Sequence, residues 1–119
     1  MHMHDWNNYR NQLLAAATGF GKLSPDTVRG YGILGGAGEK TGHLDAKTRE
    51  LIALAVAVTL RCDGCIAVHT AAARKHGAGK EETADALGVA VSMNAGAALV
   101  YSMRALDAFD ATTEEQAAA

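Results

Sequence analysis

The sequence predicts an all-α fold, a compact bundle of about six helices that assembles as a homo-oligomer. Of the 119 residues, 49% are hydrophobic but only 5% are aromatic, so the predicted core is aliphatic and rich in alanine, which suits closely packed helices. No stretch of useful length alternates between apolar and polar residues, so no sheet is expected. The length fits one domain, residues 1–119.

The first two helices are expected at residues 5–20 and 25–34. Ser24 followed by Pro25 is a strong start signal, because a capping residue precedes a proline at the first helical position. Residues 35–38, Gly-Gly-Ala-Gly, are expected to form a loop, and they lack the spacing of a phosphate-binding loop. Residues 1–4 are predicted to be a disordered tail, in which His2 and His4 could at most bind a metal adventitiously.

The third helix is expected at residues 46–60, with Asp45 as its N-cap. Its sequence is apolar from Leu51 to Val58, so we expect it to be buried, and this run is too short to span a bilayer. Glu50 stands at the edge of the buried face. It is either a solvated first-turn residue, which the helix dipole favours, or a residue that contacts His69 of the next helix.

The fourth helix, expected at residues 64–76, holds both cysteines of the chain at or near its N-terminus. If the segment is helical, Cys62, Cys65 and His69 share a sector of about 60°. Asp63 is the expected N-cap, and Gly77 is expected to end the helix in the left-handed conformation.

The spacing of these residues is typical of redox chemistry. Cys65 lies in the first helical turn, where the positive end of the dipole favours a thiolate. His69 lies one turn further on and can act as its base, while Cys62 is placed to resolve the reaction as a disulfide. Glu50 would orient His69 or relay protons for it.

Three other interpretations of the cysteine pair remain open. The thiols can be inert buried residues or form a structural disulfide, although so short a loop gains little stability from a crosslink. They can also bind zinc with His69, but His76 lies about 16 Å along the helix from Cys65 and cannot join the same ion.

The last two helices are expected at residues 80–93 and 96–111, with a break at residues 94–96. The second carries an apolar stripe that includes Leu99, Met103 and Leu106, and we expect it to form core or subunit interface. Because such apolar helices exceed what one small bundle can bury, self-association is expected.

The charge balance bounds the partners and the compartment. Eleven basic and thirteen acidic residues give a net charge of −2, which argues against a nucleic-acid partner. Neither a signal sequence nor a membrane span is evident, so we expect a cytoplasmic protein with no membrane partner. In a reducing compartment a cysteine pair is more often catalytic or metal-binding than structural.

The arrangement of Glu50, Cys62-Asp63-Gly64-Cys65 and His69, followed by Gly77-Ala78 and Glu81-Glu82, resembles the carboxymuconolactone decarboxylase family, specifically its alkylhydroperoxidase D-like branch. The resemblance covers about residues 44–109. It implies an all-helical trimer or hexamer in which Cys65 attacks a hydroperoxide, Cys62 resolves the product as a disulfide, and His69 and Glu50 relay protons. A lipoyl-bearing protein or another thiol reductant would reduce the disulfide. One departure is Gly64, where the peroxidase pattern of that branch has a further histidine.

The sequence thus predicts a dithiol oxidoreductase that reduces hydroperoxides and requires no metal or organic cofactor. One alternative is a decarboxylase-like lyase that uses His69 as acid and base and does not need the cysteines. The other is a non-enzymatic oligomeric or zinc-binding module.

Overall fold

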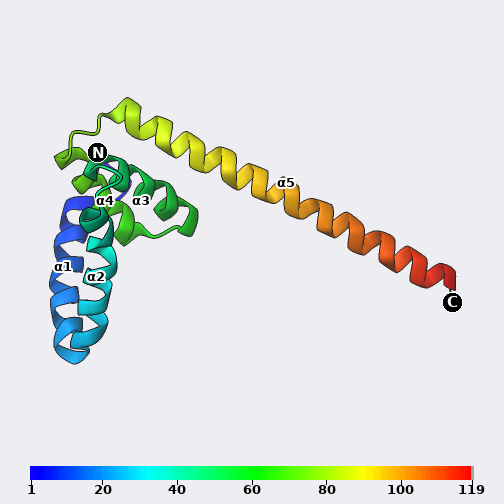
Figure 1. Ribbon diagram of the computed structural model, residues 1–119, viewed down its shortest axis with the longest axis horizontal. Helices are drawn as coiled ribbons and strands as arrows, with labels where there is room; N and C mark the ends of the chain where they lie inside the picture. Colours follow the sequence, from blue (N-terminus) through cyan, green and yellow to red (C-terminus); the bar gives the residue numbers. More distant parts are fainter. Residues whose placement is uncertain (119) are drawn as a thin grey trace.

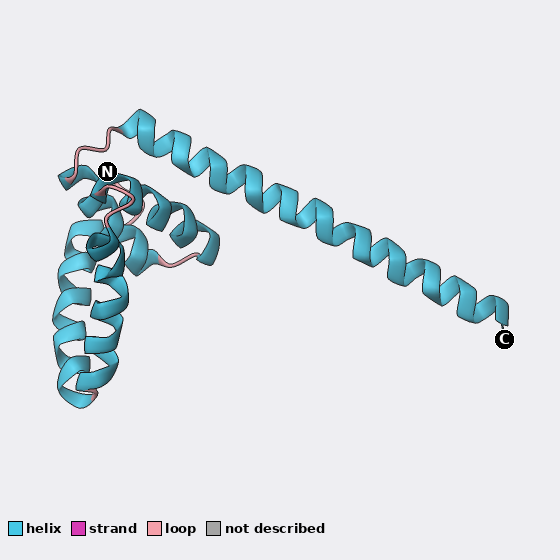
Figure 2. Cartoon of the chain, viewed as in Figure 1, coloured by secondary structure: helices cyan, strands magenta, loops and turns pink. Residues whose placement is uncertain are grey.

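Residues 1–118, the part of the chain that the computed structural model describes, form five helices and no strand (Figures 1 and 2). The helical class is therefore confirmed, but the expected number of six helices is wrong. The helices are α1 (Trp6–Leu23), α2 (Pro25–Thr41), α3 (Ala46–Leu60), α4 (Asp63–Lys75) and α5 (Lys80–Ala118).

The helices form a small packed unit from which one long helix projects. α1 and α2 lie side by side as a hairpin, α4 packs against both α1 and α3, and the first part of α5 packs against α3 (Figure 1). The rest of α5 extends away from the other helices (Figure 1). With principal extents of 61 × 39 × 38 Å, the single chain is elongated and not the compact bundle that the sequence suggested.

The buried core is small and lies between α3, α4 and α5. Leu54 of α3 is its only large side chain and is 2% exposed, and the other buried residues of the described chain are alanines: Ala57, Ala67, Ala73 and Ala90. Alanine stripes allow the helix axes to approach closely, as the sequence suggested. They also leave most of the larger apolar side chains exposed in the isolated chain.

The predicted loop at residues 35–38 is wrong, because α2 continues through it to Thr41. The helix ends at Gly42, which has a left-handed φ of 71°. Gly38 faces the start of α3, where a Cβ on it would lie 2.8 Å from Cδ of Arg49. The Arg49 guanidinium in turn donates a hydrogen bond to the Gly38 carbonyl at 3.5 Å. Glycine here allows close packing between helices, which outweighs its low helix propensity.

The predicted break at residues 94–96 is also wrong, because α5 is one helix of 39 residues. The Asn94 side chain donates hydrogen bonds to the Ala90 carbonyl (2.7 Å) and to Thr59 Oγ1 of α3 (2.9 Å). Asparagine favours turns in isolation, but Asn94 is hydrogen-bonded both within α5 and to α3. The contact with α3 therefore overrides the local propensity of Asn94.

By length and composition alone, α5 is long and apolar enough to cross a bilayer, and it has no charged residue from Ala86 to Met103. Core helices of soluble proteins pass the same test, although little of this segment is buried within the single chain. The predicted break at residues 94–96 divided this segment into two shorter helices, so no span was expected from the sequence.

Other helix boundaries follow the sequence signals. α3 has the predicted bounds, and Asp45 Oδ1 accepts a hydrogen bond from the Thr48 backbone N–H at 2.8 Å. Asp5 caps α1 in the same way through Asn8. Gly77, with φ 92°, has the left-handed conformation expected after α4.

Candidate functional site

The site is built around the sharp turn that joins α3 to α4. Arg61 ends α3 with a left-handed φ of 55°, a conformation that non-glycine residues seldom adopt. Its N–H donates to the Val58 carbonyl (3.3 Å), and the N–H of Cys62 donates to the Ala57 carbonyl (3.1 Å). These bonds close the last turn of α3 and place Cys62 directly at the start of α4.

Cys62 itself is the N-cap of α4, so the prediction of Asp63 in that position is wrong. Cys62 Sγ accepts the Cys65 backbone N–H at 3.2 Å, and Asp63 is the first helical residue. The cysteine competes successfully for the capping position because its sulfur reaches the free N–H of the residue three positions on. The positive end of the helix dipole therefore acts on the sulfur of Cys62 as well as on that of Cys65.

The two cysteines form a disulfide in the structure, with 5.3 Å between their Cα atoms. This separation lies within the usual range for a disulfide. The CxxC turn at the start of α4 therefore accommodates the oxidised pair, as a reversible dithiol site requires.

Glu50 and His69 meet between α3 and α4. His69 Nδ1 donates to Glu50 Oε2 at 2.6 Å, and the side chains are 28% and 23% exposed. Of the two possibilities for Glu50, the structure thus has the contact and not the free first-turn residue. Because Nδ1 is bonded to the carboxylate, Nε2 is the ring nitrogen left to exchange a proton with another group.

A cleft of about 550 Å³ brings His69 and the cysteine pair together. His69, Cys62 and Cys65 form its polar side, together with Asp63. Its other side is largely apolar and comes from α1 and α2: Tyr9, Leu13, Leu14, Ala17 and Tyr31. Open clefts of this size with one reactive side are typical of small-molecule sites.

The contribution of α1 to the site was not predicted from the sequence. Tyr9, Leu13 and Ala17 recur at intervals of four residues, a helical spacing that indicates one apolar face. That signal predicts that α1 packs against something, but it does not reveal the element on which it packs.

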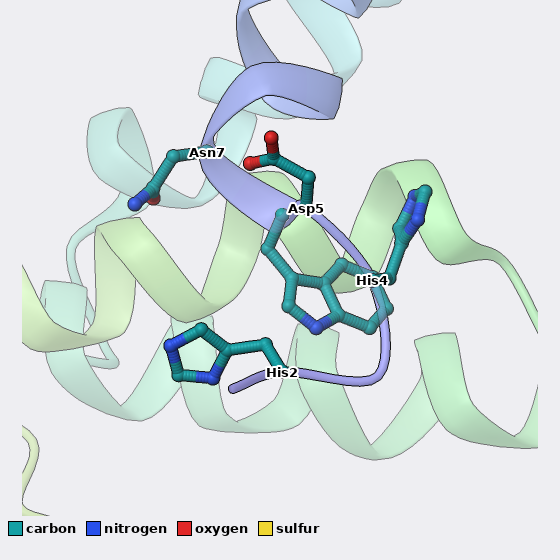
Figure 3. Close-up of a pocket in the computed structure, with 5 residues that line it drawn as sticks. His2, His4, Asp5 and Asn7 are labelled. Carbon is teal, nitrogen blue, oxygen red and sulfur yellow. The ribbon is translucent and has the colours of Figure 1, made fainter.

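The N-terminal histidines do not form a comparable site. His2 and His4 line a shallow pocket, but their rings point away from each other (Figure 3). The His4 ring packs edge-on against Trp6, with 4.8 Å between centroids, and also contacts Tyr9. Within residues 1–118, no group of three or more His, Cys, Asp or Glu side chains is placed to hold a metal ion.

Comparisons with known proteins place this arrangement in a family. Residues 25–108 match the family model described as "Carboxymuconolactone decarboxylase family". An uncharacterized protein of Haemophilus influenzae is 48% identical over 105 residues, which cover 88% of this chain and 93% of that protein. An uncharacterized protein of Cupriavidus necator is 35% identical over 91 residues, 76% of this chain and 80% of its own length.

A third relative, "Uncharacterized protein 4 in cox locus" of Paracoccus denitrificans, is 44% identical over 69 residues, which cover 58% of this chain and 62% of that protein. None of these three names states an activity. The family match extends over well more than half of the chain and includes Glu50, both cysteines and His69. The chain belongs to the carboxymuconolactone decarboxylase family.

Proposed function

We propose that the protein is a dithiol oxidoreductase that reduces hydroperoxides through a Cys62–Cys65 disulfide cycle. The proposal rests on the cleft that Cys62, Cys65 and His69 share. The two cysteines can form a disulfide there, and Nδ1 of His69 is hydrogen-bonded to the Glu50 carboxylate. This combination of nucleophile, base and orienting group is the general arrangement for an activated nucleophile.

The first step is attack of the Cys65 thiolate on the terminal oxygen of a hydroperoxide, ROOH. The O–O bond breaks, the sulfur gains that oxygen as a sulfenic acid, and the alcohol ROH leaves with a proton. His69 takes the thiol proton at Nε2 and delivers it to the departing alkoxide. Glu50 stabilises the charged ring and fixes its orientation.

The second step closes the disulfide. The Cys62 sulfur attacks the Cys65 sulfenic acid, the S–S bond forms, and water leaves with the Cys62 proton. Two thiols are oxidised and one peroxide is reduced, so the electrons balance. A thiol reductant, or a protein that carries a lipoyl group, then returns two electrons and two protons to the pair.

Single-turnover oxidation of the reduced protein tests the proposal. One equivalent of cumene hydroperoxide is expected to remove both free thiols and to lower the mass by two hydrogens. Cys65→Ser should abolish peroxide consumption. Cys62→Ser should still react once and stop at a sulfenic acid or mixed disulfide on Cys65.

Three results would contradict the proposal. They are full peroxide consumption by Cys65→Ser, a stable sulfinic acid in the wild-type protein, and no thiol loss at all. If a variant with both cysteines replaced decarboxylated a lactone substrate as fast as the wild-type protein does, the chain would instead be a lyase that uses His69.

A further inference from the structure

α1 lies outside the segment that matches the family model, which begins at Pro25, and yet it forms much of the cleft. Its four lining residues, Tyr9, Leu13, Leu14 and Ala17, are here called the α1 wall. The segment that carries the family match therefore provides the cysteines and the Glu50–His69 pair, while a separate helix provides most of the apolar surface opposite them.

The α1 wall packs against the CxxC turn, residues 62–65. A Cβ on Gly64, between the two cysteines, would lie 2.8 Å from Leu13 Cδ2 and 3.8 Å from the Tyr9 hydroxyl oxygen. Leu13 thus occupies the space that any side chain at position 64 would enter. One helical turn further along α4, the Arg10 guanidinium donates to the Ala67 carbonyl at 3.5 Å, so α1 is held to α4 at two levels.

We propose that the α1 wall determines the substrate specificity of this site, with Leu13 as the principal residue and Gly64 as the position that admits it. This inference rests on the proposed function. Because Leu13 and Tyr9 line the cleft beside the cysteines, an apolar body attached to the reactive group gains contact area there. A small hydrophilic peroxide makes no such contact, and its reaction is independent of the wall.

The test compares two peroxides on one set of variants. The second-order rate constant of thiol oxidation is measured in reduced full-length protein, with cumene hydroperoxide and with hydrogen peroxide. Leu13→Ala is expected to lower the rate constant for cumene hydroperoxide about 10-fold and to leave that for hydrogen peroxide within about 2-fold. Leu13→Met, which nearly conserves volume, should retain the preference. Leu23→Ala is the matched control, because Leu23 belongs to the same helix, is 87% exposed and lies outside the cleft.

Gly64 supplies a second, independent variant. In Gly64→Ala the new methyl group displaces the end of the Leu13 side chain, and the rate with cumene hydroperoxide should fall. In the Leu13→Ala variant the Leu13 Cδ2 atom is absent, so adding Gly64→Ala should lower the rate little further. The effects of the two substitutions on the rate should therefore be non-additive. Additive losses, an equal loss for both peroxides, or no change in Leu13→Ala would each overturn the inference.

Binding of an unreactive alcohol separates this inference from the proposed function. 2-Phenyl-2-propanol, the alcohol product of cumene hydroperoxide, is titrated into the protein and followed by NMR. If neither peroxide oxidises the thiols of the wild-type protein, the proposed function fails. Weaker binding of the alcohol to Leu13→Ala than to wild type would still support a binding role for the α1 wall. The inference is overturned if the alcohol does not bind to the wild-type protein, or if it binds equally well to wild type and to Leu13→Ala.

Discussion

At the scale of single residues, the most informative contact is the short hydrogen bond between His69 and Glu50. It joins two residues that stand 19 positions apart in the sequence. Residue types and helical spacing made this contact one of two possibilities, the other being a solvated first-turn Glu50. The crossing of α3 and α4, which depends on the turn at Arg61 and on the buried alanines, decides it.

The first prediction concerns this pair. His69→Ala is expected to slow peroxide attack by about 10² to 10⁴-fold, because it removes the proton acceptor. Glu50→Gln should slow it in the same direction but by less, since the amide still bonds to the ring and only the charge is lost. The double variant should be no slower than His69→Ala alone, because Glu50 acts through His69. Stopped-flow measurement of thiol oxidation checks this, and losses that multiply would show that Glu50 acts separately.

The second prediction concerns the order in which the thiols react. His69 is placed one helical turn after Cys65, and we expect alkylation of the reduced protein at neutral pH to modify Cys65 first, as peptide mass mapping after brief labelling would show. The capping position of Cys62 makes this a demanding test, because the Cys65 N–H donates to the Cys62 sulfur and, kept in the reduced protein, this bond would favour a thiolate at Cys62. First labelling at Cys62 would exchange the proposed roles of the two thiols.

Gly64 shows where sequence reasoning at this scale must stop. The resemblance identified it as a departure from a pattern with histidine, and nothing local gave a reason for the glycine. The contact that bears on it is distant in the sequence, since the end of the Leu13 side chain of α1 lies where a side chain at position 64 would begin. A residue whose identity depends on a neighbour about fifty positions away cannot be explained from its own segment.

At the scale of helices, the signals that could be interpreted were those that act locally. The caps at Asp45 and Gly77 and the start of α2 at Pro25 are local features, and the structure has them as predicted. Gly38 of α2 and Asn94 of α5 are local breakers that contact α3 in the structure. Helix ends were therefore predictable where a cap defines them, and helix continuity was not.

The third prediction tests the cap of α3. Hydrogen bonding from Thr48, through its side chain and then its backbone N–H, holds the pKa of the Asp45 carboxyl below its ordinary value of 3.8. Because the folded pKa is the lower one, ionised Asp45 stabilises the fold above pH 3.8, and this contribution is lost as the pH falls through the folded value.

Asp45→Ala should accordingly lower the melting temperature at neutral pH, and the difference from wild type should shrink below pH 3.8. Asp45→Asn, which keeps an acceptor oxygen without the charge, is the matched control and should lose less at neutral pH. Circular dichroism melts across this pH range measure both. A gap between wild type and Asp45→Ala that widens on acidification would contradict the assignment of the cap.

At the scale of the whole molecule, the dominant feature is apolar surface that one chain does not cover. On α5, nine large hydrophobic side chains are more than half exposed, and they are Val89, Val91, Met93, Leu99, Val100, Tyr101, Met103, Leu106 and Phe109. On α3, Val56 and Leu60 are also more than half exposed, and Ile52 is about half exposed. Monomers in water seldom expose so much contiguous apolar surface, so either protein or lipid must cover it. We propose that further copies of this chain cover it.

The attachment of α5 to α3 favours protein over lipid as its cover. Near the start of the helix, Glu82 is already paired with Lys47 of α3 at 3.1 Å, and Asn94 is bonded to Thr59. The first part of α5 is thereby fixed to the helices that carry the site, and the rest extends away from them.

The last prediction is that the protein forms a homo-oligomer, a trimer or hexamer by its family resemblance, in buffer without detergent. Light scattering coupled to size exclusion at micromolar concentration should give a multiple of the 12.3 kDa chain mass. Leu99→Glu with Met103→Glu places two charges on the exposed part of α5 and should shift the protein toward the monomer, because burying an unpaired carboxylate at an interface is costly. Thr112→Glu, on the same helix but outside its uncharged stretch, should leave the mass unchanged. A stable wild-type monomer, or a protein that requires detergent and sediments with membranes, would show that copies of the chain do not cover α5.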